Sequence, residues 1–119
     1  MPKVLLAEDD MTMVSLLKTL LKMENFQVVA LDADADVPAA VREEQPDVLL
    51  LDVHLSQQDG IEILKILRAG EETKDVRVVM TSGLNMKDEC LRRGANDFLL
   101  KPYMPDDLVS ILKKTISAL

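Results

Sequence analysis

Short aliphatic runs and longer amphipathic stretches alternate along the chain. Between the runs, apolar residues recur at three- and four-residue steps, the spacing of one helix face; after the first run they are Met13, Leu16, Leu17, Leu20 and Leu21. The pattern predicts a repeated order of strand and helix. The runs expected as strands are KVLLA (3–7), FQVVAL (26–31), DVLLL (47–51), VRVVM (76–80) and DFLL (97–100).

Further helices are predicted over residues 37–44, 60–68 and 86–93 and at the C-terminal end. In the last of these helices Pro105 lies near the start, where a proline is best tolerated. Its apolar face comprises Leu108, Ile111, Leu112, Ile116 and Leu119. Strand–helix alternation, with strands that are apolar almost throughout, predicts a doubly wound α/β fold with helices on both faces of a parallel sheet.

Polar residues stand where the predicted strands end. Parallel strands in such folds bring their carboxyl ends to one edge of the sheet, and ligands bind there. Several carboxylates meeting at this edge repel one another unless a cation lies between them, and Mg²⁺ binds such a set together with water and phosphate oxygens. The residues at these ends are Glu8, Asp9, Asp10, Asp52, Thr81, Ser82 and Lys101.

Asp52 closes the aliphatic run VLLLD and is the candidate nucleophile. A carboxylate beside Mg²⁺ can attack phosphorus and form an aspartyl phosphate, provided that charge on the phosphoryl oxygens is neutralised. Mg²⁺, the ammonium group of Lys101 and the hydroxyl of Ser82 are suited to hold one oxygen each. Asp10 is better interpreted as a helix cap, and Asp59–Gly60 as a turn and helix start.

These residues carry a resemblance to the receiver domains of two-component response regulators, and it extends from end to end of the chain. The matching stretches are VLLAEDD, PDVLLLDVHLSQQDG, VVMTSG, GANDFLLKPY and the closing helix. The resemblance implies a flavodoxin-like (βα)5 sandwich with a five-stranded parallel sheet in the order 2-1-3-4-5. It also implies a signalling module that a histidine kinase or phosphotransfer protein phosphorylates on Asp52, and that then switches the binding of an effector protein or output domain.

The resemblance assigns the metal site residue by residue. Glu8 and Asp9 match the acidic pair that organises Mg²⁺, and Asp52 and the backbone carbonyl of His54 would be further ligands. His54 is the single histidine of the chain, and no second histidine or cysteine pairs with it, so zinc is not expected. We expect its side chain to influence the water that hydrolyses the acyl phosphate.

The resemblance also assigns the phosphoryl contacts and the switch. Ser82, and not Thr81, falls at the family's hydroxyl position, and Lys101 falls at its lysine position with an expected cis bond to Pro102. Phe98 falls at the aromatic switch position, although a core aromatic is an equally good interpretation. Tyr103 and Met104 are expected on a partner surface.

Two segments depart from the family pattern. Ser56 stands where the family often has proline, and Gln57 and Gln58 make the following loop polar, so we expect a more mobile loop. The stretch from Ser82 to Gly94 is shorter than usual, which predicts a short or irregular fourth helix.

The length of the chain limits the number of domains. The 119 residues are enough for one domain, and no output domain follows in them, so we expect a single receiver domain, either stand-alone or cut from a longer protein.

The net charge of −7 argues against direct nucleic-acid binding. No apolar run approaches the roughly 20 residues of a membrane span, and no signal peptide opens the chain, so we expect a cytoplasmic protein without membrane contact. Phosphorylation-dependent homodimers are common among the proteins it resembles.

Other functions fit the same fold. One is an adaptor that phosphate never reaches; another is an aspartyl-phosphate phosphohydrolase, which requires a second acid two positions after Asp52, where this chain has His54. A flavoprotein is disfavoured because acids, rather than a phosphate-binding loop, follow the first strand. We therefore expect no enzymatic activity beyond self-catalysed phosphoryl transfer and autodephosphorylation. The expected cofactor is Mg²⁺.

Overall fold

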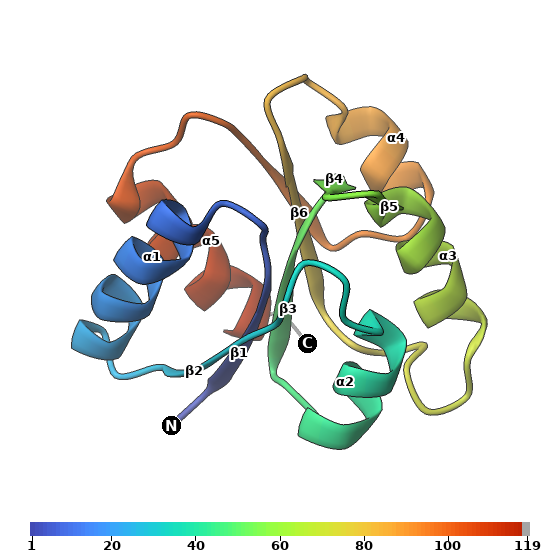
Figure 1. Cartoon of the computed structure of the whole chain (residues 1–119), viewed down its shortest axis with the longest axis horizontal. Helices are drawn as coiled ribbons and strands as arrows, with labels where there is room; N and C mark the ends of the chain where they lie inside the picture. Colours follow the sequence, from blue (N-terminus) through green and yellow to red (C-terminus); the bar gives the residue numbers. More distant parts are fainter. Residues whose placement is uncertain (118–119) are drawn as a thin grey trace.

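The computed structural model describes residues 1–117 and arranges them as a parallel sheet between two layers of helices (Figure 1). The main sheet has five strands: β1 (Lys3–Ala7), β2 (Gln27–Ala30), β3 (Val48–Asp52), β6 (Val78–Ser82) and β7 (Asp97–Leu100). Their order across the sheet is β2-β1-β3-β6-β7, and every pairing is parallel. This is the predicted order 2-1-3-4-5, because the two strands numbered in between form a separate small sheet.

The helices are α1 (Met11–Met23), α2 (Val37–Glu44), α3 (Gly60–Ala69), α4 (Lys87–Arg92) and α5 (Pro105–Ser117). Asp10 caps α1 as predicted, since its carboxylate accepts the N–H groups of Thr12 and Met13 at 3.0 and 3.2 Å. Asp59 caps α3 in the same way through the N–H of Ile61. Helix α4 has six residues and no side-chain cap, which confirms the prediction of a short fourth helix.

Two apolar clusters fill the spaces on the two faces of the sheet. Helices α1 and α5 cover one cluster, and α2, α3 and α4 cover the other (Figure 1). The four aliphatic residues of β3 alternate between the clusters, and all five residues of the strand are buried, as expected for a strand covered on both faces. Within residues 1–117 no helix has the length and apolar character needed to span a bilayer.

Some predicted positions were wrong. Leu16 is 55% exposed, because the buried face of α1 is formed by Val14, Leu17 and Leu21. The fourth main strand lies two residues further along the chain than predicted and ends with Ser82 itself. Leu119, assigned to the apolar face of the last helix, lies outside the described residues.

A small antiparallel hairpin, which the sequence did not indicate, follows β3. It consists of β4 (His54–Leu55) and β5 (Gln58–Asp59), joined through Ser56 at φ +56°. Proline has its φ fixed near −65°, so the family's usual proline would not allow this turn. The side-chain amide of Gln58 donates to the carbonyls of Ala33 and Ala35 at 2.9 and 3.1 Å, which ties the hairpin to the β2–α2 loop. The polar segment is thus a defined hairpin.

Candidate functional site

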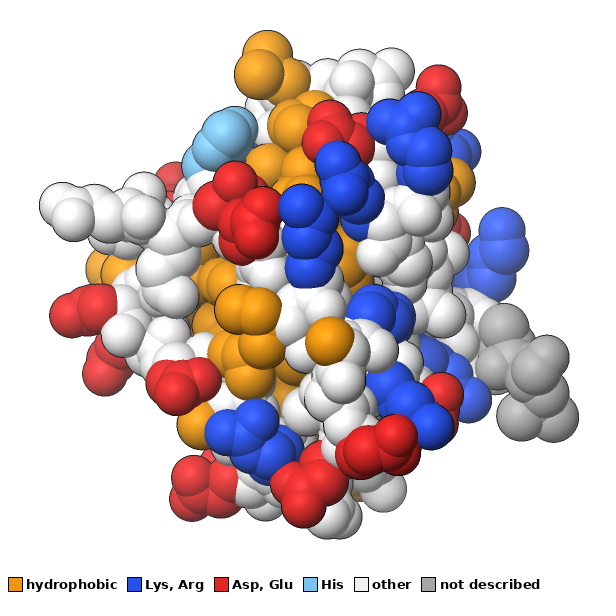
Figure 2. Space-filling model, turned by 90° about the vertical axis from the view of Figure 1, so that its right-hand side faces the viewer, with side chains coloured by type: hydrophobic (Ala, Val, Ile, Leu, Met, Phe, Trp, Pro, Cys, Tyr) orange, Lys and Arg blue, Asp and Glu red, His pale blue; other side chains and the backbone are white. Residues whose placement is uncertain are grey.

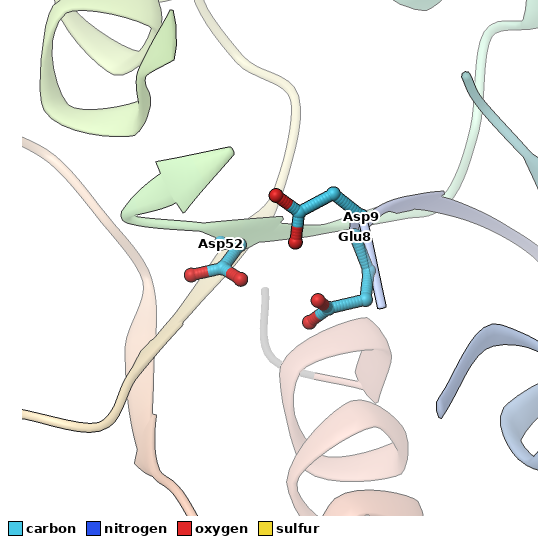
Figure 3. A group of neighbouring side chains, drawn as sticks. All are labelled: Glu8, Asp9 and Asp52. Carbon is cyan, nitrogen blue, oxygen red and sulfur yellow. The ribbon is translucent and has the colours of Figure 1, made fainter. Parts of the chain in front are cut away.

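Three carboxylates meet at the carboxyl edge of the sheet (Figure 3). Glu8 and Asp9 follow β1, and Asp52 ends β3; the two strands are paired, so their ends lie side by side. One oxygen from each carboxylate lies within 4.8 Å of the others. Glu8 and Asp52 are 3% and 6% exposed, whereas Asp9 is accessible from solvent. The structure therefore brings together all three side chains predicted as metal ligands.

Lys101 joins the two buried carboxylates. Its Nζ lies 2.7 Å from Oε2 of Glu8 and 2.9 Å from Oδ2 of Asp52. Burial alone would lower the pKa of Lys101, but its hydrogen bonds to Glu8 and Asp52 and their negative charges outweigh burial, so the pKa is raised. The ammonium group is therefore retained as the counter-ion of the site.

Burial raises the pKa of the Glu8 carboxyl, and the charge of Asp52 adds to this effect. Hydrogen bonds from Lys101 and from the N–H of Asp10, which lies 3.1 Å from Oε1, oppose it only in part. Keeping Glu8 and Asp52 both charged therefore costs free energy, although the ammonium group of Lys101 lies between them. A hard divalent cation bound by carboxylate oxygens would relieve this repulsion, so the donor set fits Mg²⁺.

The backbone around Asp52 fixes the direction of its carboxylate. The N–H of His54 donates to Oδ1 at 3.1 Å, so each carboxylate oxygen has one donor. Gly60 lies against the same backbone: a Cβ there would overlap the carbonyl oxygen of Asp52. The N–H of Gly60 donates to the carbonyl of Val53 at 2.7 Å. Only glycine lets α3 begin this close to the end of β3.

The β4–β5 hairpin holds the carboxylate of Asp9 in place. Its Oδ2 accepts the N–H of Ser56 at 2.7 Å. A proline at position 56 has no N–H to offer, so this contact depends on the residue by which the chain departs from the family pattern. The accessible carboxylate is thereby oriented by the loop that follows the strand of Asp52.

The two hydroxyls at the end of β6 have different partners. Thr81 Oγ1 donates to the carbonyl of Leu99 at 2.7 Å and is thus committed to β7. Ser82 Oγ accepts the N–H of Leu84 at 3.1 Å, and the Ser82 carbonyl accepts the N–H of Lys101 at 2.8 Å. Ser82 and Lys101 therefore end neighbouring strands side by side, in keeping with the preference for Ser82 over Thr81.

Phe98 and Pro102 complete the predicted set. Phe98 is buried in the cluster beneath α2, α3 and α4, as the core interpretation expects, and its switch role stays a prediction. The Lys101–Pro102 bond is cis, as predicted.

Sequence reasoning missed two contributions to this edge. The N–H of Ser56 was not anticipated, because its role depends on a turn of positive φ. Tyr103, expected only on a partner surface, directs a buried hydroxyl into the protein. Its position two residues after Lys101 was the available signal.

Comparisons with known proteins agree with this geometry. The sequence matches the family model described as "Response regulator receiver domain" over residues 4–113. It is 34% identical over 113 residues to the transcriptional regulatory protein CpxR of Escherichia coli, covering 95% of this chain and 48% of that protein. It is 30% identical over 119 residues to the chemotaxis protein CheY of Listeria monocytogenes, covering 96% of this chain and 98% of that protein. The chain thus spans about half the length of the CpxR relatives.

Solved receiver structures resemble the fold closely. A putative response regulator from Chloroflexus aurantiacus superposes with a TM-score of 0.89 at 28% identity, covering 99% of this chain and 100% of that one. The receiver domain of the sensor histidine kinase PA1611 from Pseudomonas aeruginosa has a TM-score of 0.85 at 26% identity, covering 98% of each chain. Its structure is described with a magnesium ion coordinated in the active site cleft.

Proposed function

This chain belongs to the response-regulator receiver-domain family, and on that premise we propose that it accepts a phosphoryl group on Asp52 in a Mg²⁺-dependent reaction. The observation that carries the proposal is the meeting of Glu8, Asp9 and Asp52 at one edge of the sheet, where Lys101 bonds two of them, Glu8 and Asp52. The accessible Asp9 and the buried pair form a site open on one side. Such a site suits a cation and a phosphoryl donor that arrive from solvent.

In the proposed reaction an oxygen of Asp52 attacks the phosphorus of a phosphohistidine or a small acyl phosphate. The bond from phosphorus to the donor breaks, the donor keeps the electron pair, and an aspartyl phosphate forms. Bound Mg²⁺, held by Glu8, Asp9, Asp52 and the carbonyl of His54, would neutralise charge on the phosphoryl oxygens. Lys101 donates to one phosphoryl oxygen, and the hydroxyl of Ser82 donates to another.

The proposed switch between the resting and the phosphorylated state follows from the contacts that phosphorylation of Asp52 changes. A phosphoryl group on Asp52 carries two negative charges and competes with Glu8 for Lys101. Ser82 Oγ accepts the N–H of Leu84, so a bond from its own hydroxyl proton to the phosphoryl group would link that group to the β6–α4 loop. Because β7 and the buried Phe98 lie next to this loop, the new contacts bias the face formed by α4, β7 and α5.

That face carries the apolar surface expected of a regulated interface. Leu84 and Met104 are 65% and 67% exposed, and Leu91 of α4 and Leu100 of β7 are exposed as well. Figure 2, which views the molecule from the side of α3 and α4 in Figure 1, shows apolar side chains at the surface with basic and acidic side chains around them. We infer that a histidine kinase or phosphotransfer protein supplies the phosphoryl group. An effector, an output domain or a second copy of the chain then binds the altered face.

Autodephosphorylation is the return step of the same proposal. Water attacks phosphorus, inorganic phosphate leaves, and the carboxylate of Asp52 is restored. An aspartyl phosphatase requires a second acid two positions after its nucleophile, where this chain has His54, which is exposed. We therefore expect no steady turnover of phosphate esters.

Acetyl phosphate with Mg²⁺, followed by intact mass measurement, tests the proposal. We expect the mass of one phosphoryl group to be added in the presence of Mg²⁺, and no mass to be added when a chelator is present from the start or when the chain carries Asp52→Asn. Asn retains the shape and one acceptor oxygen, so the variant separates chemistry from folding. A wild-type chain that stays unlabelled, or a variant labelled equally well, would contradict the assignment of Asp52.

A further inference from the structure

The β4–β5 hairpin supplies two backbone donors to the carboxyl edge of the sheet. The N–H of His54 donates to Oδ1 of Asp52 at 3.1 Å. The N–H of Ser56 donates to Oδ2 of Asp9 at 2.7 Å. Asp9 follows β1 whereas Asp52 ends β3, so one short segment bonds carboxylates that come from two strands. The hairpin therefore sets the directions of both carboxylates.

Asp9 depends on its bond to the hairpin more than the other acidic side chains do. Glu8 and Asp52 are buried and share the ammonium group of Lys101. Asp9 is accessible from solvent, and among the described residues Ser56 is the one donor to its carboxylate. An accessible side chain without a partner samples several rotamers, and binding a metal ion then costs the entropy of fixing one. The bond from Ser56 fixes the carboxylate before the ion arrives and occupies only one of its two oxygens.

The donor itself is held in place from two sides. Leu55, next to Ser56, is fully buried in the cluster beneath α2, α3 and α4. After the turn, the side-chain amide of Gln58 donates to the carbonyls of Ala33 and Ala35 at 2.9 and 3.1 Å. Ser56 lies between these two anchors, and its φ of +56° turns the chain from one toward the other. Packing and the β2–α2 loop thus fix the position of its N–H.

We propose that the β4–β5 hairpin is a positioning element for the metal ion, in which the N–H of Ser56 orients Asp9 and the amide of Gln58 fixes the hairpin. The inference rests on the proposed function, in which Asp9 holds Mg²⁺, and deepens it. Because coupling between two sites is reciprocal, the bound ion in turn strengthens the anchoring of the hairpin to the β2–α2 loop. Magnesium binding is thereby linked to a loop that contributes no ligand.

Two substitutions test the inference, and both leave every proposed metal ligand in place. Ser56→Pro removes the N–H and excludes the positive φ, so we expect about fivefold weaker Mg²⁺ binding, as for the loss of one solvent-accessible hydrogen bond to a charge. Gln58→Ala keeps the N–H of Ser56 but releases the hairpin, and we expect about twofold weaker binding. Thermal unfolding over a Mg²⁺ titration measures the affinity without any phosphoryl donor.

The neighbouring glutamine is the matched control for Gln58→Ala. Gln57 is exposed at the same turn, and its side chain bonds no other residue within the described part of the chain. Gln57→Ala should therefore bind Mg²⁺ as the wild type does. Ser56→Gly is the conservative counterpart of Ser56→Pro, because glycine retains the N–H and adopts a positive φ without strain. It should restore the affinity that proline removes.

Amide hydrogen exchange separates positioning of the metal ion from a general loosening of the hairpin. In the wild type we expect Mg²⁺ to slow exchange at Ser56 and in residues 33–36, because the ion and the hairpin contacts stabilise each other. In Gln58→Ala, Mg²⁺ should no longer slow exchange in residues 33–36. A hairpin with a structural role alone would exchange faster in the variant, but its exchange would not respond to Mg²⁺ in either chain.

The outcomes separate the inference from the function on which it rests. Wild-type Mg²⁺ affinity in Ser56→Pro or in Gln58→Ala would overturn the inference. Binding to Ser56→Gly as weak as to Ser56→Pro would overturn it too, because the N–H would then not be the group that matters. A wild type that shows no response to Mg²⁺ in either measurement and is not labelled by acetyl phosphate contradicts the proposed function itself, and the inference with it.

Discussion

Half-buried cations stand at both edges of the sheet, and they face different partners. At the carboxyl edge, Lys101 bonds two carboxylates, those of Glu8 and Asp52. At the amino edge, the guanidinium of Arg68 bonds neutral acceptors. These are the carbonyls of Gly94, Lys74 and Val76, at 2.9, 3.0 and 2.7 Å, and the side-chain oxygen of Asn96 at 3.1 Å.

The difference in partners suggests different roles: the contacts of Arg68 hold the fold together, whereas those of Lys101 can be exchanged for other contacts. Burial lowers the pKa of Arg68, and the charge of Asp75 opposes this, but an arginine remains charged in either case. Its acceptors are backbone and amide oxygens, which carry no net charge. The partners of Lys101 are carboxylates, which a metal ion can also bind. The same kind of charge thus secures one edge and leaves the other able to change.

The largest expected effect comes from Arg68→Met. We expect the free energy of unfolding to fall by about 3 kcal/mol, because several part-buried acceptors lose their donor at once. Urea unfolding measures the loss, and Arg92→Met, at an exposed site, should lie within about 0.5 kcal/mol of wild type. Below its unfolding temperature the variant should still be labelled on Asp52 by acetyl phosphate. If the folded variant were not labelled, the two edges would not be independent.

Gly60→Ala brings a destabilising change directly to the carboxyl edge. The new Cβ would meet the carbonyl oxygen of Asp52 and, at 2.9 Å, the Cα of Val53, so the end of β3 must shift. We expect a loss of about 2 kcal/mol together with slower labelling by acetyl phosphate. At Gly83 an added Cβ meets no described atom within 4 Å, so Gly83→Ala is the control and should change neither quantity appreciably. Normal labelling of Gly60→Ala would show that the position of β3 is not critical.

Lys101→Met tests whether the cation competes with a metal ion for the same carboxylates. Without Mg²⁺ we expect a loss of about 1 kcal/mol, because Glu8 and Asp52 then repel each other without a counter-ion. Mg²⁺ should restore most of the stability and bind several-fold more tightly than to wild type, as followed by thermal unfolding over a Mg²⁺ titration. Lys113→Met removes an exposed pair with Glu24 and should change neither property. Unchanged Mg²⁺ affinity in Lys101→Met would argue against competition.

The smallest effect is expected from His54→Met. The N–H that orients Asp52 belongs to the backbone and is retained, so stability and labelling should match the wild type. The imidazole is exposed two positions after Asp52, and we expect it to influence the water that attacks the acyl phosphate. We expect the aspartyl phosphate to persist a few-fold longer in the variant, measured as the decay of the labelled mass. Equal half-lives would remove this role from His54.

The sequence predicted those features that each element carries by itself. Periodicity identified every strand of the main sheet, because a parallel strand buried on both faces must be apolar almost throughout. Residues that end such strands share an edge in any fold of this class, so Glu8, Asp9 and Asp52 were predicted together. The error at Leu16 has the same origin, since the helical repeat does not say which of two adjacent apolar positions faces the sheet.

The tertiary structure decided the contacts between distant segments. Lys101 reaches Glu8 across 93 residues of sequence and Asp52 across 49, and no local pattern says that it bridges both. The hairpin after β3, the bond from Ser56 to Asp9 and the buried hydroxyl of Tyr103 likewise depend on turns and packing. Periodicity records which side of an element is buried, whereas donor and acceptor geometry exists only once the chain has closed on itself.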